Sequence, residues 1–188
     1  MKRSMMWVMG VLATMMFVGA GCATAPASPQ ERQELQRDAD AALRDMKTAS
    51  PSIGDILTNG HAYAIFPSIG KGGAIVGGAY GRGVVYQGGK LIGYSDLSQG
   101  SIGLQLGGQT FSELVVFQNA DALAKFKQGN YAFAADASAV ALKSGASVAA
   151  DYRNGVAVFT NPIGGAMFQA TVGGQEFTFM AADQVQGD

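Results

Sequence analysis

The sequence predicts an α+β fold: an antiparallel, partly barrel-like β-sheet built from Gly-Gly hairpins, with two N-terminal helices and one helix inserted near 119–129. Two observations lead to this prediction. Between residues 63 and 117, glycine recurs every few residues inside sequence that otherwise has the pattern of strands. Between residues 28 and 57, apolar residues recur at helical spacing instead. Because glycine weakens a strand, its repetition indicates tight turns, bulges or close backbone contacts.

Two helices are expected to precede the sheet. Ser28 is a typical N-cap, Pro29 suits the first helical position, and Glu31 can complete a capping box. The apolar stripe of this helix consists of Leu35, Ala39, Ala42, Leu43 and Met46. Its opposite face carries charges of both signs, which favours packing against a core over lying on a membrane surface. A second, shorter helix is expected to begin at 50–51 and to stop at 59–60.

Four residue pairs predict two-residue hairpin loops, because a type I′ turn requires positive φ at both positions and glycine adopts it without steric cost. They are Gly88–Gly89, Gly107–Gly108, Asn154–Gly155 and Gly173–Gly174. Such loops would place three apolar pairs opposite each other, namely Leu104 with Phe111, Ala170 with Phe177 and Phe168 with Phe179. Asn119 is expected to cap a helix that ends at Gly129. Strands are then expected to resume around 134–142 and 156–159.

The first 22 residues have the pattern of an export signal. Lys2 and Arg3 precede an apolar run of 14 residues, which is short for a membrane span of ~20 residues. Gly-Ala-Gly then precedes Cys22, the only cysteine in the chain, and this arrangement resembles the bacterial lipobox. The resemblance implies acylation of Cys22; the alternative is an ordinary signal peptide with an incidental cysteine. The predicted organisation is a lipoprotein signal peptide over 1–21, a tether over 22–28 and a single domain over 29–188.

The residue after the cysteine bears on localisation. Ala23 stands where an inner-membrane retention signal would have aspartate, so the resemblance to lipoprotein sorting rules favours the outer membrane. Several acyl chains anchor a protein firmly, whereas a single chain does so only marginally. The protein is therefore expected to be lipid-anchored in the outer membrane, with its domain facing the periplasm or the cell surface.

The composition argues against several classes of protein. Without residues 1–21 the chain has 11 basic and 14 acidic side chains, a net charge of −3, so nucleic acid is not an expected partner. His61 is the only histidine and is expected to be a surface or capping residue; the alternative is a serine-type catalytic triad. One histidine with scattered carboxylates offers no metal-ligand spacing, so no metal or other cofactor is expected. The glycine-rich segment 68–83 lacks Gly-Lys-Ser/Thr and continues as a strand, which excludes a P-loop.

Three basic side chains lie on or near the glycine turns. They are Lys71, Arg82 and Lys90. Backbone amides in such turns can form anion-binding nests, so these residues are the candidates for contact with lipid headgroups. The alternative is that they are solvated residues that discourage pairing between sheet edges of different molecules.

Three segments carry a family resemblance: 66–86 (FPSIGKGGAIVGGAYGRGVVY), 100–109 (GSIGLQLGGQ) and 135–138 (ADAS). They are similar to the SYLF-domain family, which includes eukaryotic adaptors, the yeast actin-binding Ysc proteins and many bacterial lipoproteins. The resemblance extends over about 35–180. It implies a lipid-binding domain, with phosphoinositides as ligands of eukaryotic members and actin as a partner of some.

The expected function is that of a non-catalytic envelope lipoprotein whose domain recognises anionic phospholipid headgroups. Actin is not an expected partner in this setting, and no protein partner is indicated. Three alternatives stay open: a structural or partner-binding lipoprotein without a specific lipid ligand, an outer-membrane pore, and an enzyme.

Overall fold

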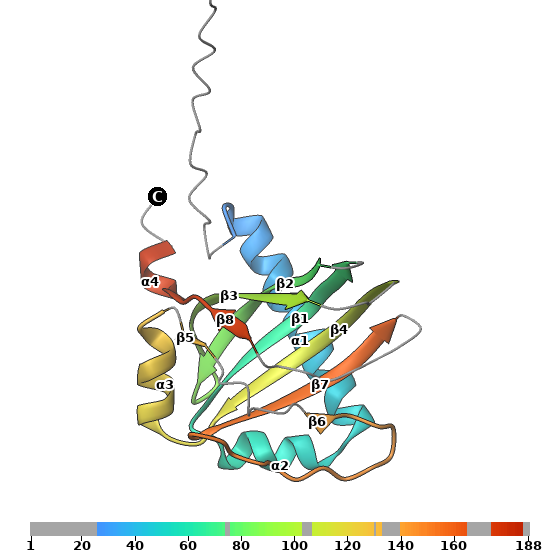
Figure 1. Ribbon diagram of the computed structural model, residues 1–188. Coiled ribbons are helices and arrows are strands. Elements are labelled where there is room, and N and C mark those ends of the chain that lie inside the picture. The colour runs from blue at the N-terminus through green and yellow to red at the C-terminus, as the bar shows by residue number, and fades with distance from the viewer. Residues whose placement is uncertain are drawn as a thin grey trace, which may run out of the picture.

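One curled sheet forms the centre of the molecule, with α1 and α2 packed on one face and α3 on the other (Figure 1). This computed structural model describes residues 26–73, 76–102, 107–129, 131–132, 140–164 and 174–185. The predicted α+β class, with a curled and mostly antiparallel sheet, is confirmed.

The strands pair in an order that differs from their order in the chain. Their bounds are β1 Ala62–Gly73, β2 Val76–Gln87, β3 Lys90–Ile102, β4 Gly107–Phe117, β5 Tyr131–Ala132, β6 Val140–Ala141, β7 Val156–Gly164, β8 Gln175–Phe177 and β9 Met180–Ala181. The sheet order is β5-β8-β3-β2-β1-β4-β7-β6, and β9 pairs with β3 outside this path. Only β6 and β7 pair in parallel among the described strands. The long strands β1 and β2 therefore lie in the middle of the sheet.

The helices α1 and α3 begin where their capping residues predict, whereas α2 begins at Ser52 without a side-chain cap and α4 was not predicted. Their bounds are α1 Pro29–Ala49, α2 Ser52–Asn59, α3 Ala120–Lys127 and α4 Ala182–Val185. Ser28 Oγ accepts a hydrogen bond from the Glu31 amide at 3.2 Å, and the Glu31 carboxylate accepts from the Ala27 amide at 3.0 Å. The reciprocal cap thus closes one residue earlier than a standard capping box. Asn119 Oδ1 accepts from the Ala122 amide at 2.9 Å, which confirms the predicted start of α3.

Each face of the sheet has its own apolar core. We call them the α1 face and the α3 face, after the helix that packs on each. The α1 face includes Ala39, Met46, Ile53, Ile65, Val84, Tyr94, Leu114 and Phe159. The α3 face includes Phe66, Ile69, Val85, Leu97, Phe111, Val115, Phe117, Phe126 and Phe177. Small side chains on α1 let it approach the sheet, where Tyr63 and Tyr86 stack with ring centres 5.3 Å apart.

A β-bulge in β1 determines which side chains reach each face. Register shifts occur beside Pro67 in the pairings of β1 with both β2 and β4. Proline lacks the amide hydrogen that a central strand needs, so a bulge is the position where it is tolerated. Before the bulge Phe66 faces the α3 core, and after it Ile69 does. The side-chain alternation is thereby shifted by one residue for the rest of the strand.

Two of the predicted hairpin loops are confirmed and one is wrong. Gly88 and Gly89 join β2 to β3 with φ of +56° and +75°. Asn154 and Gly155 likewise have φ of +52° and +79°, between the bridged residues on either side. Residues 107–108, by contrast, belong to β4 and pair with β1, and β3 and β4 are not neighbours.

The pairing expected from the 107–108 loop fails for the same reason. Phe111 lies opposite Ile69 of β1 and Pro162 of β7. A glycine pair was a poor guide here because the segment is an uninterrupted strand whose partner comes from a distant part of the chain. Several other expectations lie outside the described residues: Cys22, Leu104, Phe168, Ala170, Gly173 and most of 134–142. Gly174 has φ of +77°.

The glycines of the misassigned pair belong to a row that crosses the sheet. Gly108 of β4, Gly72 of β1, Gly78 of β2 and Gly100 of β3 are successive Cα partners. All four are exposed, at the end of the sheet that α1 does not cover. This glycine row places four of the 27 glycines in strands rather than in turns.

Elsewhere in the sheet glycine is required for close packing. A Cβ added at Gly83 would lie 2.6 Å from the Phe66 ring and 2.7 Å from the Ile65 carbonyl oxygen. Gly83→Ala should therefore lower the free energy of unfolding by about 2–3 kcal/mol, because the backbone and the Phe66 ring must both move. Urea unfolding followed by far-ultraviolet circular dichroism measures this change.

Gly70→Ala is the matched control, since a Cβ there would have no heavy atom within 4 Å. Its effect should stay within about 1 kcal/mol. Equal losses for the two variants would contradict the close approach at Gly83.

Candidate functional site

The three predicted basic residues do not form one cluster. Lys71 lies opposite Ala79, whereas Lys90 lies opposite Gln87. These two partners are eight residues apart on β2, so the lysine backbones are separated by ~26 Å along the strands. Lys71 is also on the α3 face, near the glycine row, because the bulge in β1 has shifted the alternation. A single headgroup cannot contact both lysines.

Arg82 is already engaged on the α1 face. Its Nε lies 3.7 Å from Asp96 Oδ1 and donates a hydrogen bond to Tyr80 Oη at 3.2 Å. Burial raises the pKa of Asp96 to about 6, and the nearby Arg82 guanidinium offsets part of that rise. The side chain of Arg82 is 40% exposed, so the ion pair is accessible to solvent. An anion at this position would have to compete with the Asp96 carboxylate.

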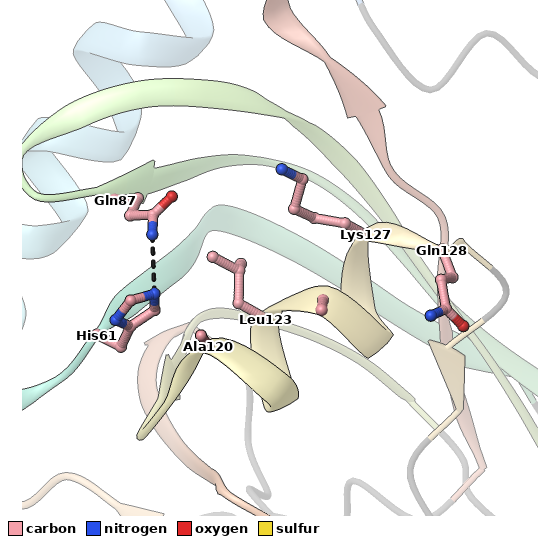
Figure 2. A pocket seen from close by; sticks show the side chains of 7 residues that line it. His61, Gln87, Ala120, Leu123, Lys127 and Gln128 are labelled. Carbon is pink, nitrogen blue, oxygen red and sulfur yellow. Dashed lines mark hydrogen bonds between the residues drawn. The ribbon is translucent and has the colours of Figure 1, made fainter.

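A hollow of about 360 Å³ lies between α3 and the adjoining ends of β1 and β2 (Figure 2). Its lining residues are His61, Gln87, Ala120, Leu123, Ala124, Lys127 and Gln128. The Asn119 cap fixes the start of α3, and the Gly88–Gly89 turn brings Gln87 and the start of β3 to this end of the sheet. The start of α3 and the turn between β2 and β3 are thus determined by local sequence, but only the folding of the whole chain brings these elements together.

The polar groups of the hollow are mostly hydrogen-bond donors. Gln87 Nε2 lies 2.8 Å from His61 Nε2; with the amide as donor, the neutral ring carries its proton on Nδ1. The Lys127 ammonium lies 5.8 Å from the centre of the Phe179 ring, a cation–π contact that positions this side chain. Figure 2 shows the Lys127 ammonium on the same side of the hollow as Gln87. No carboxylate lines the hollow among the described residues.

Among the predicted residues, Lys90 does not line this hollow but lies directly opposite Gln87, which does. Residues directly opposite each other on neighbouring strands project from the same face, so the Lys90 side chain starts on the face that carries Gln87. His61, Gln87 and Lys127 were not predicted as binding residues. They are up to 66 positions apart in the sequence, and no local pattern joins them. The arrangement suits a small anion held by ammonium and amide groups.

A second polar cluster is buried inside the α3 face. Glu113 is 0% exposed, and its Oε2 accepts a hydrogen bond from Gln175 Nε2 at 3.0 Å. Burial raises the pKa of Glu113 to about 8, and the Gln175 hydrogen bond offsets part of that rise. This burial was not predicted, because in the sequence Glu113 has the appearance of an exposed polar residue at the start of an apolar run.

The Glu113 carboxyl should make stability depend on pH. The folded state binds this proton more tightly than the unfolded chain does, so the stabilising contribution is complete below pH 4.5, the ordinary pKa. This contribution is lost as the pH rises to about 8. Above that pH the titration of Glu113 changes the stability no further. Relative to Glu113→Gln, the wild type should lose at most about 5 kcal/mol across this range. Urea unfolding at a series of pH values in choline chloride measures the difference.

Glu176→Gln, an exposed neighbour on β8, provides the control and should follow the wild type at each pH. A difference between the wild type and Glu113→Gln that does not change with pH would show that Glu113 is ionised throughout.

Comparison with known proteins leaves the function to be argued from this geometry. No profile of a known protein family matches the chain, and no curated protein sequence matches it either. The SYLF-domain resemblance therefore stays a prediction from the sequence.

Proposed function

We propose that the protein is a non-catalytic envelope lipoprotein whose domain binds anionic phospholipid headgroups in the hollow beside α3. The observation that supports this most is the lining of the hollow, which includes one lysine and two glutamines and no carboxylate among the described residues. Lys90 adds a second positive charge on the same face. A negatively charged phosphate would gain charge-assisted hydrogen bonds there, which are about twice as strong as neutral ones.

The local charge matters because the domain as a whole is slightly acidic. Positive charge gathered at one end of an otherwise negative molecule orients it toward an anionic surface, and salt weakens that attraction. An acyl anchor at Cys22 would keep the domain close to the membrane, so a weak headgroup site would suffice for occupancy. No helix in the described part of the chain has the length and apolarity required to cross a membrane.

A headgroup site in the hollow predicts different effects of mutation from a site formed by the three basic residues Lys71, Arg82 and Lys90 together. In a flotation assay, protein lacking residues 1–22 should bind phosphatidylglycerol vesicles and not phosphatidylcholine vesicles. Lys127→Glu should weaken the binding at least tenfold, because it places a negative charge against the headgroup. Raising the salt concentration should weaken the binding of the wild type as well.

Lys143→Glu makes the same charge change at an exposed residue beside the end of α1, on the face of the sheet opposite α3, and should bind as the wild type does. Lys71→Glu should also have little effect, whereas a site at the glycine row would be destroyed by it. Equal loss in all three variants would indicate a diffuse attraction by net charge and would contradict a site in the hollow.

A structural or protein-binding role is the second candidate. It is favoured by the exposed side chain of Tyr80, 51% accessible, beside the bare glycine row. Crosslinking in intact cells that recovers one stoichiometric protein partner, together with no flotation on any vesicle, would support this role over headgroup binding.

A further inference from the structure

Three oxygen-bearing side chains meet inside the α3 face of the sheet. Glu113 of β4 and Thr160 of β7 are directly opposite each other in the register, so their side chains project side by side. Gln175 of β8, four places from β4 in the sheet order, reaches Glu113 across the curled α3 face through the 3.0 Å hydrogen bond. Glu113 is 0% exposed, and Thr160 and Gln175 are each 1% exposed. The three residues are surrounded by apolar side chains such as Phe66 and Phe111.

The hydrogen bonds within this cluster are incomplete. Glu113 Oε1, Thr160 Oγ1 and Gln175 Oε1 are buried and have no hydrogen-bond partner among the described residues. An amide oxygen and an ionised carboxylate oxygen are acceptors only, and the threonine hydroxyl has one hydrogen to give. When Glu113 is ionised, at least one of these acceptors therefore needs a donor or a cation from elsewhere. A buried acceptor without a partner destabilises the folded state, because its hydration is lost and not replaced.

Above a pH of about 8, where the Glu113 carboxyl is ionised, the charge of the cluster is also unmatched. The ion pairs of the described chain join Arg82 to Asp96 and Arg153 to Asp151, and neither includes Glu113. Directly opposite Glu113 on the two neighbouring strands lie Phe66 and Thr160, which are neutral. An ionised carboxylate without a positive partner in such a place is strongly unfavourable.

We propose that Glu113, Thr160 and Gln175 form an internal site for one small monovalent cation of the class of Na⁺. Carboxylate, hydroxyl and amide oxygens are hard ligands, which suit hard cations and not soft metals. The charge determines the valence: one carboxylate neutralises one positive charge, whereas a divalent ion would leave a net charge buried among phenylalanines. Gln99, the Cα partner of Gln175 and also buried, brings a further amide to the same region. A water molecule would complete the hydrogen bonds but would leave the carboxylate charge unmatched.

The test compares salts whose cations differ in size. Full-length protein purified in detergent is equilibrated overnight at pH 9 in 150 mM NaCl or 150 mM choline chloride, because a buried site exchanges only when the fold opens. Thermal unfolding followed by circular dichroism should show a Tm several degrees higher in NaCl, since an ion that binds only the folded state stabilises it. Choline is too large for the site and keeps the ionic strength equal.

Two variants distinguish a bound ion from a general salt effect. Glu113→Gln should have the same Tm in both salts, and Glu176→Gln should keep the difference seen in the wild type. If Glu113→Gln does not fold, Thr160→Val provides the same test, since it removes one ligand and should reduce the Tm difference between the two salts. Equal Tm values for the wild type in both salts, or a Na⁺ effect that survives in Glu113→Gln, would overturn the proposal. The vesicle assays do not involve this site, so they neither support nor contradict it.

Discussion

The rest of the structure depends on one requirement, that the central strands bury side chains on both faces at once. β1 sends Ile65 into the core beneath α1 and Phe66 into the core beneath α3. The bulge at Pro67 then shifts the alternation by one residue, so that Ile69 continues the α3 core. The same shift places Lys71 on the α3 face and leaves Gly70 and the glycine row on the other. The bulge at Pro67 thus determines that Lys71 and the glycine row lie on opposite faces at this end of the sheet.

The two ends of the sheet differ in chemistry as a result. One end has the glycine row and little side-chain cover. The other end is closed by α3 and has the hollow with Lys127 and Gln87. Between them, inside the α3 face, lies the Glu113 cluster. A headgroup site at the α3 end and an internal ion are independent proposals, because they use different residues at different places on the α3 face.

Local signals predicted the elements well and their neighbours poorly. The caps at Ser28 and Asn119 and the turn at Gly88–Gly89 each act within four residues, so the sequence predicts them directly. The partner of β4 is instead decided by packing between segments about 45 residues apart, which no local pattern contains. The hollow depends on that same packing, so only Lys90 of its surroundings was anticipated. The burial of Glu113 likewise follows from tertiary structure, since its own neighbours in sequence are those of an ordinary strand.

The position of β4 beside β1 also sets the order in which the sheet can assemble. β1, β2 and β3 follow one another through short connections, so they can pair as soon as each is available. β4 must then return past two strands to reach the free edge of β1, and β7 can add only after β4 is in place. During that interval β1 presents an unpaired, apolar edge. This is the stage at which association with another copy competes most strongly with completing the sheet.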